Sequence, residues 1–351
     1  MKGSIDRVRT ILRGGTPDRP PLYDLLRNDA IIAHFAGEPA TVENGPEVVF
    51  RAYEPAIDAT RPLIRTPNAE REERLADGST RRYYRWTIWN SPVPYASGDD
   101  YAARKKRLLD AWDGGWNPAR QAALDATLAR HADERRRLGE VYRFLAGPCE
   151  WLESLYCDTG LDRFVYFLAD YPDLIEELLE INTLETILWA AHLPADPDID
   201  AVFLADDLAY RTGSIFNPRW LDRVYMPRLA RIVEAFHRRN IKVLYHSDGN
   251  LWRILDALVD AGIDALNPLE VIAGMDAGEV HRRYPRLLLA GGIDVSGLLV
   301  FGSPEAIRQT VRCVIDAAEA RILAGSSTEV HNAVPLENYL ALRDAVLEYR
   351  S

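Results

Sequence analysis

The chain has 351 residues, 47% of them hydrophobic, and carries 42 Lys and Arg against 53 Asp and Glu, a formal net charge of −11. This length suits one large α/β domain or two smaller ones, and it can bury a substantial core without disulfides. The acidic balance and the lack of a long basic run argue against nonspecific binding to nucleic acid or to anionic membranes.

Three widely spaced cysteines, Cys149, Cys157 and Cys313, do not form a disulfide framework. The amino terminus lacks the apolar core of a signal peptide, and no apolar stretch approaches the roughly 20 residues of a spanning helix. We therefore expect a cytoplasmic protein.

Short apolar runs of β type alternate with amphipathic helical patterns, which is typical of a parallel sheet with helical crossovers. The expected strands are Pro21–Leu25, Ile57–Ile64, Val141–Ala146, Ala201–Ala205, Ile241–Tyr245, Ala265–Leu269, Leu287–Gly291 and Arg321–Gly325. Asn217-Pro218 and Ser303-Pro304 predict helix starts. Eight such strands predict an α/β (β/α)8 barrel of TIM type, formed by residues 1–351 as a single domain. An open doubly wound sheet is the alternative, although it usually needs fewer strands.

Residues 68–139 break this alternation. Asp77-Gly78 lies between two flanks that mix charged and aromatic residues, which is a hairpin signal, and highly charged helical sequence follows over residues 99–137. We interpret 68–139 as a hairpin-plus-helix insertion between strands 2 and 3. It could cover the barrel mouth as a lid, meet a partner, or be a solvated excursion.

Polar residues follow most of the expected strands, where α/β barrels hold their active sites. They are Asp24 with Arg27, Asp58, Glu150 with Tyr156, Asp206 with Asp207, His246 with Asp248, Asn267 with Glu270, Asp294, and Ser326 with His331. Any one of these carboxylates could instead cap a helix. So many carboxylates in one water-poor cavity are tolerable if a metal or a cationic substrate lies among them, or if some are protonated.

His246 and Asp248 end the apolar run Ile241–Tyr245 and are two residues apart, so both can point to the same side of a strand. Imidazole and carboxylate are common metal ligands. The third ligand would be Asp206, Glu270, Glu150 or His331. The alternative is a hydrogen-bonded pair that orients a loop. Gly291-Gly292 lacks the spacing of a nucleotide-binding loop and a P-loop lysine, so we expect no nucleotide cofactor.

These residues resemble the uroporphyrinogen decarboxylase superfamily, which includes the decarboxylase and the zinc methyltransferases of corrinoid-dependent methyl transfer. The resemblance covers roughly the whole chain apart from the insertion. It implies a TIM-type barrel with its active site at the carboxyl rim, and Asp58 and Tyr156 lie where the family's aspartate and tyrosine are expected. The matching segments are 17–21, 147–148, 156–160, 206–207, 217–218, 246–250, 261–267, 291–294 and 334–339.

The chain departs from both branches of the superfamily. Of the pair of arginines that hold the decarboxylase substrate, Arg27 alone can remain, and the acidic rim would repel a highly anionic tetrapyrrole. The methyltransferases hold zinc with His-x-Cys and a later cysteine, whereas Asp248 and Ser326 stand at those cysteine positions here. A divalent metal such as zinc would therefore be held by nitrogen and oxygen.

We expect an enzyme that transfers a methyl group from a small methylated compound to a corrinoid protein or a thiol, and we allow for a homodimer. The expected catalytic residues are Asp58, Tyr156, Asp206, His246 and Asp248; the expected metal ligands are His246, Asp248 and Glu270; the expected substrate-binding residues are Arg27, Glu150, Asn267, Ser326 and His331.

One alternative is a metal-free decarboxylase of a small carboxylic acid or a porphyrinogen-like substrate. In that enzyme Arg27 would bind the carboxylate, and Asp58 or Asp206 would stabilise a protonated intermediate. A second alternative is a non-catalytic barrel that binds a ligand or a partner protein.

Overall fold

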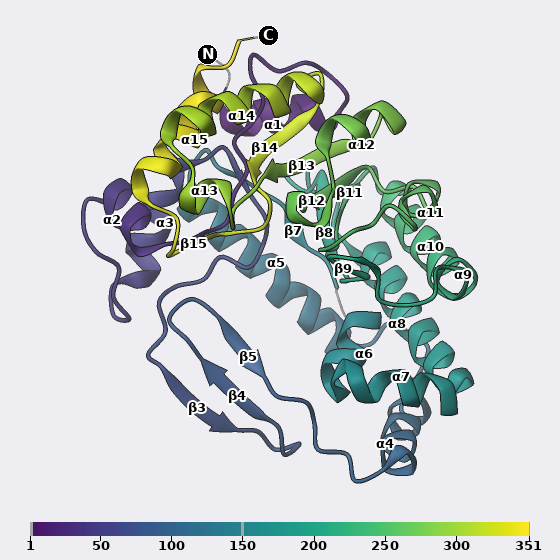
Figure 1. Ribbon diagram of the computed structural model, residues 1–351. Coiled ribbons are helices and arrows are strands. Elements are labelled where there is room, and N and C mark those ends of the chain that lie inside the picture. Colours follow the sequence, from purple (N-terminus) through teal and green to yellow (C-terminus); the bar gives the residue numbers. More distant parts are fainter. Residues whose placement is uncertain (1–2, 149–150, 351) are drawn as a thin grey trace.

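The computed structural model describes residues 3–148 and 151–350 and has an α/β fold (Figure 1). Its largest sheet is parallel, with the strand order β14-β13-β12-β11-β8-β7. These strands are β7 (Leu145–Ala146), β8 (Ala201–Ala205), β11 (Lys242–His246), β12 (Ala265–Leu269), β13 (Leu288–Ile293) and β14 (Ile322–Ser326). The later expected strands are thus found within two residues of their predicted bounds.

Further parallel pairs connect the two edges of this sheet. β2 (Ala59–Thr60) pairs with β6 (Tyr142–Arg143), Tyr23 bridges to Ala59, and Leu22 bridges to Ala324 in β14. The first two expected strands are much shorter than predicted. Within the first, the backbone N–H of Leu22 donates to the Asp58 carboxylate and not to a neighbouring strand.

Period-two alternation divides the strand residues into two buried layers. One set packs with Val8, Ile11 and Leu12 of α1 (Ser4–Leu12) in the smaller of two buried clusters, here called the inner set. This inner set includes Phe203, Leu244, Ala265, Leu288 and Leu323. The other set, which includes Val202, Tyr245 and Leu266, belongs to the larger cluster beneath the helices. By the same alternation, His246 and Asn267 continue the inner set at the carboxyl ends of β11 and β12.

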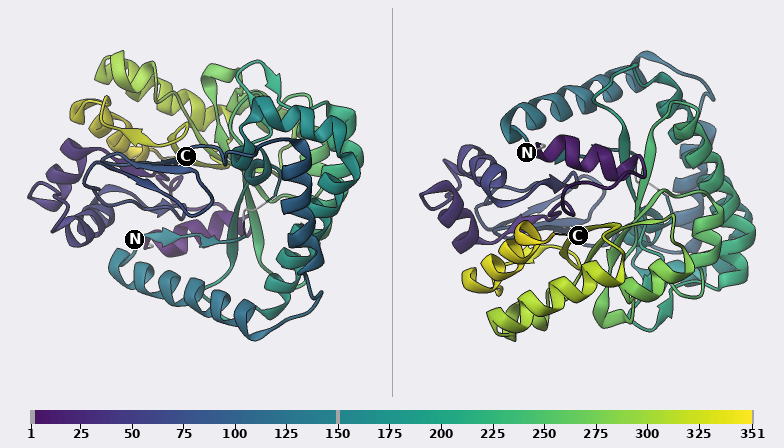
Figure 2. Two further views of the ribbon diagram at one scale, coloured as in Figure 1. Left: turned by 90° about the horizontal axis from the view of Figure 1, so that it is seen from below. Right: turned by 90° about the horizontal axis from the view of Figure 1, so that it is seen from above.

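Helices surround the strands (Figure 2). They are α2 (Asp29–Ala36), α3 (Gly45–Ala56), α5 (Pro118–Leu138), α6 (Leu152–Thr159), α7 (Leu161–Asp170), α8 (Pro172–His192), α9 (Pro218–Trp220), α10 (Met226–His237), α11 (Leu255–Asp260), α12 (Ala277–Arg283), α13 (Leu298–Phe301), α14 (Pro304–Ala317) and α15 (Leu336–Glu348). Asn217 and Ser303 cap helix starts as predicted, since their side chains accept from Arg219 and Ala306. No helix of the described chain has the length and apolar character needed to cross a bilayer.

The hairpin expected at Asp77-Gly78 is confirmed. β3 (Arg71–Arg74) and β4 (Thr80–Tyr83) pair antiparallel, and β5 (Ile88–Asn90) adds a third strand. This small sheet and α4 (Gly98–Asp110) lie on the side of the molecule away from α1 (Figure 1). α5, which the sequence analysis placed in the insertion, instead packs against α3, β6 and β7. This packing is typical of a crossover helix, so within 68–139 the residues up to about 117 are the part outside the layer of helices around the strands.

Asp58 lies at the amino ends of the strands and not at the expected active site. It directly precedes β2, and its carboxylate accepts hydrogen bonds from Ser4, Arg7 and Arg19. Burial alone would raise the pKa of Asp58, but the hydrogen bonds and charge of Arg19 hold it below its usual value. The role of Asp58 is therefore to anchor α1 and the 17–21 segment against the strands.

We predict that Asp58→Asn lowers the free energy of unfolding by about 3–5 kcal/mol at pH 7, because it breaks a buried ion pair. A carboxylate whose folded pKa is lowered stabilises the fold above its unfolded pKa of about 3.9 and loses that contribution as the pH falls through the folded value. Urea unfolding should therefore show the difference between wild type and variant at neutral pH and a smaller difference under acid conditions.

Asp18→Asn is the matched control, because Asp18 also pairs with Arg7 but its side chain is 43% exposed. We expect a change of at most about 1 kcal/mol for this surface pair. Equal losses from the two variants would contradict the role assigned to Asp58.

Candidate functional site

Three ligand-type side chains meet at the carboxyl ends of β8 and β11. Suitable ligand atoms of Asp207, His246 and Asp248 lie within 4.8 Å of one another. His246 Nε2 is 3.9 Å from the Oδ1 atoms of both carboxylates. The backbone N–H of Asp248 donates to Asp207 Oδ1 at 2.8 Å, which links the loops after the two strands. Gly249 follows with φ 93°, where a Cβ would lie 2.5 Å from the backbone of Ala209, so glycine is required at this turn.

Asn267 sets the tautomer of His246. Asn267 Oδ1, which can only accept, lies 2.7 Å from His246 Nδ1 and 3.2 Å from Arg61 Nη1. Arg61 Nη1, which can only donate, also lies 3.1 Å from His246 Nδ1. Because the contact with Asn267 is the shorter of the two, we assign the proton of the neutral imidazole to Nδ1, and both neighbours then donate to Asn267 Oδ1. The lone pair of Nε2 is then left facing Asp207 and Asp248. Asn267 Nδ2 is buried without a hydrogen-bond partner among the described residues and is free to donate to a ligand.

Two buried arginines share one carboxylate beside His246. Arg61, the residue after β2, donates from Nη2 to Glu329 Oε2 at 3.0 Å, and Arg27 donates from Nη1 to Glu329 Oε1 at 2.6 Å. Glu329 lies just before β15 (Val330–His331), which pairs with β1 (Leu26–Arg27). These contacts place Arg27, one of the expected substrate-binding residues, together with Arg61 and Glu329 at the edge of the site.

The electrostatics favour a neutral imidazole among carboxylates. Burial, and then the positive charge of Arg61, lower the pKa of His246. Burial, and then the negative charge of Asp207, raise the pKa of Asp248. The same two causes raise the pKa of Glu153 to about 7. The site thus concentrates negative charge that a cation would relieve.

Glu153 and Tyr156, both on α6, hold Asp207 in place. Glu153 Oε2 accepts from the Asp207 N–H at 3.2 Å, and the Tyr156 hydroxyl donates to the Asp207 carbonyl at 2.9 Å. Burial raises the pKa of Tyr156, so its hydroxyl stays protonated. Tyr156 therefore lies next to the group around His246.

The donor set fits a divalent metal. Asp248 Oδ1 is buried without a hydrogen-bond partner in the described chain, even though 40% of its side-chain surface is exposed. Together with His246 Nε2 and an oxygen of Asp207, it offers one nitrogen and two oxygens, a combination that suits zinc or a similar ion. A hydrogen bond from the distal nitrogen of a ligating histidine to a fixed acceptor is common in such sites.

Glu270 is not one of these three residues. Its Oε2 accepts from the Gly249 N–H at 2.6 Å. It therefore stabilises the turn after Asp248.

The side chains of several other expected residues bond elsewhere, although the backbone N–H of Asp206 donates to the His246 carbonyl at 3.0 Å. The Asp206 carboxylate faces α6 and accepts from the backbone N–H groups of Leu152 and Glu153, and burial raises its pKa to about 8. Ser326 donates to Asp24 at 2.6 Å, and His331 Nδ1 accepts from the backbone of Ala333. Glu150 lies outside the described residues.

Arg61 and Glu329 were missing from the expected site. Asp207 was named among the residues that follow the strands but was given no role, which the alternation of β8 could have supplied. Phe203 and Ala205 face the inner cluster, so Asp207 faces inward and Asp206 outward. Arg61 had a weaker signal, its place directly after Ala59-Thr60. Nothing in the sequence marks Glu329, because its position depends on the pairing of β15 with β1.

Comparison with known proteins places the chain in a family. Residues 132–349 match the family model described as uroporphyrinogen decarboxylase (URO-D). No curated protein sequence matches the chain significantly.

Two solved structures show different degrees of likeness. A methyltransferase from Methanosarcina mazei is 18% identical, with a TM-score of 0.67 and 99% of each chain covered. An uncharacterised protein is 11% identical, with a TM-score of 0.32 over 94% of this chain and 70% of its own. The methyltransferase shares the fold over its whole length. With the family model matching more than half of its residues, the chain belongs to the uroporphyrinogen decarboxylase family.

Proposed function

We propose that this chain is an enzyme that transfers a methyl group from a small methylated compound to a corrinoid protein or a thiol. The observation that carries the proposal is the convergence of Asp207, His246 and Asp248, with Nε2 free to act as a ligand. The fold shared with the Methanosarcina mazei methyltransferase supports it. We further propose that the parallel pairings from Leu22 round to β14 form the expected (β/α)8 barrel, and that its mouth holds this site.

In this proposal Asp207, His246 and Asp248 would hold a divalent metal such as zinc, which, when bound, would act as a Lewis acid toward the oxygen or nitrogen that carries the methyl group. Asn267 keeps the imidazole in the ligating tautomer and offers Nδ2 to the substrate. Arg61 keeps the imidazole neutral, and Tyr156 orients Asp207. Arg27, bound to Glu329, lies where an anionic part of the substrate can compete for its guanidinium.

The segment 68 to about 117 is proposed as a lid or partner-binding element over this mouth. Arg85 donates to Asp29 on α2, while Tyr95 and Lys105 contact Asp158 on α6. These contacts fasten the segment to two helices that follow strands at the carboxyl side of the fold. A corrinoid protein would have to approach the site from this side.

The proposed metal site predicts one divalent ion per chain after equilibration with zinc and removal of excess. His246→Ala and Asp207→Asn should abolish this binding, since each removes a ligand. Asn267→Ala should weaken it by about 10- to 100-fold, because the imidazole loses the acceptor that orients it. Elemental analysis and competition with a chromogenic chelator provide the measurement.

His237→Gln is the control, since His237 also pairs with a carboxylate, Asp264, but lies far from the site on α10. It should retain the full metal content. A wild-type protein without metal, or a His246→Ala protein with one ion per chain, would remove the metal from the proposal.

The reaction itself is tested with methoxy and methylamine compounds and a reduced cobalt corrinoid as acceptor. We expect the absorbance of the methylated corrinoid to appear with wild type and its rate to fall at least about 100-fold in His246→Ala, a loss of roughly 3 kcal/mol of transition-state stabilisation. Release of carbon dioxide from a small carboxylic acid, without methyl transfer, would instead support the decarboxylase. Substrate binding without turnover would support the non-catalytic barrel.

A further inference from the structure

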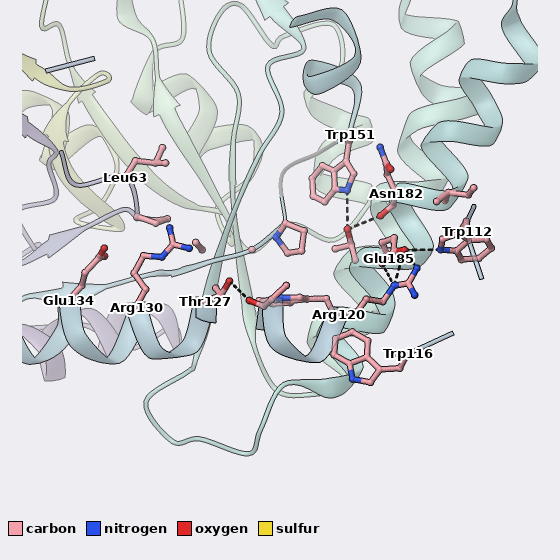
Figure 3. A pocket seen from close by; sticks show the side chains of 18 of the residues that line it. Leu63, Trp112, Trp116, Arg120, Thr127, Arg130, Glu134, Trp151, Asn182 and Glu185 are labelled. Carbon is pink, nitrogen blue, oxygen red and sulfur yellow. Dashed lines mark hydrogen bonds and ion pairs between the residues drawn. The ribbon is translucent and has the colours of Figure 1, made fainter. Parts of the chain in front are cut away.

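A large cavity lies apart from the proposed metal-binding residues around His246. It has a volume of about 980 Å³ and is bordered by α5, α8 and the segments that follow β2 and β7 (Figure 3). None of Asp207, His246 and Asp248 lines it. Its volume is within the range of about 300–1,000 Å³ that is usual for small-molecule sites.

Tryptophan forms much of the wall. Trp112, Trp116, Trp151 and Trp189 border the cavity, and these are half of the 8 tryptophans in the chain. Trp151 donates from Nε1 to Thr186, and Trp112 donates to Glu185 at 2.8 Å, so both indoles are fixed by their N–H groups. Rigid aromatic walls favour a ligand with a planar apolar body.

The charges around the cavity do not balance. Two of its arginines have carboxylate partners, since Arg120 bonds to Glu185 and Arg143 pairs with Glu134. For the other two, Arg65 and Arg130, no hydrogen bond or ion pair is found with any residue in the described part of the chain. Figure 3 shows Arg130 and Arg120 along the same helix, α5. The cavity is therefore bordered by two arginines without a carboxylate partner in the described chain, the half-buried Arg65 and the solvent-exposed Arg130, beside an aromatic wall.

The cavity also borders the segment that carries Arg61. Leu63 lines it, and its φ of 89° is an uncommon, strained conformation for a residue with a side chain. Leu63 is two residues from Arg61, which donates a hydrogen bond to Asn267 beside His246. An occupant of the cavity would thus touch the turn that places Arg61.

We propose that this cavity is a second ligand site that binds a planar anionic small molecule. The planar body lies against the tryptophans, and the anionic group, a carboxylate, sulfonate or phosphate, pairs with Arg65 and Arg130. Charge-assisted bonds to guanidinium are among the stronger polar contacts available to an anion. This inference is independent of the proposed methyl transfer, because it involves none of Asp207, His246 and Asp248.

The test uses 8-anilinonaphthalene-1-sulfonate, a planar anion whose fluorescence rises on binding, with energy transfer from tryptophan as a second signal. We expect saturable binding of one molecule per chain. Arg65→Gln and Arg130→Gln should each weaken it about tenfold, and the double variant about 100-fold. N-phenyl-1-naphthylamine, the same ring system without the sulfonate, should bind wild type and variants within about twofold of one another.

Arg238→Gln is the matched control, since Arg238 is an exposed arginine with 74% of its side chain accessible at the end of α10. It and His246→Ala should bind the sulfonate as wild type does, which separates this site from the proposed active site. Wild-type affinity in the Arg65→Gln/Arg130→Gln double variant, with unchanged circular dichroism, would overturn the proposal. So would loss of binding in His246→Ala.

Discussion

One shared acceptor, Asn267 Oδ1, organises the candidate site. It takes hydrogen bonds from both His246 and Arg61, and so it fixes which imidazole nitrogen is protonated and keeps a guanidinium close to that ring. The guanidinium in turn helps to keep the imidazole uncharged. A neutral imidazole with a free Nε2, facing two carboxylates, is the state that a metal requires.

The balance of charged side chains differs between the two ends of the strands. At the amino ends, carboxylates and guanidiniums are matched: Asp58 joins Arg7 and Arg19, and Arg9 pairs with Asp198 and Asp200. At the carboxyl ends, Asp207, Asp248 and Glu153 outnumber the cations that touch them, and two of them have raised pKa values. Matched charge stabilises the fold, whereas unmatched charge is a feature of sites that bind something.

The cavity and the candidate site are connected through a short piece of chain. Residues 61–65 run from Arg61, beside His246, to Arg65, at the cavity wall, and include the strained Leu63. The physical link is the backbone itself, not a chain of side-chain contacts.

Local periodicity, turn chemistry and i, i+2 spacing were enough to predict the strands from Ala201 onward, the hairpin at Asp77-Gly78 and the pairing of His246 with Asp248. The folded chain was needed to show that Asp58 lies at the far end of the strands, that Asp207 and not Asp206 faces His246, and that Arg61 and Glu329 join the site. These features depend on which distant segments meet, and contacts between residues more than 200 positions apart, such as Arg61 with Glu329, leave no local pattern in the sequence.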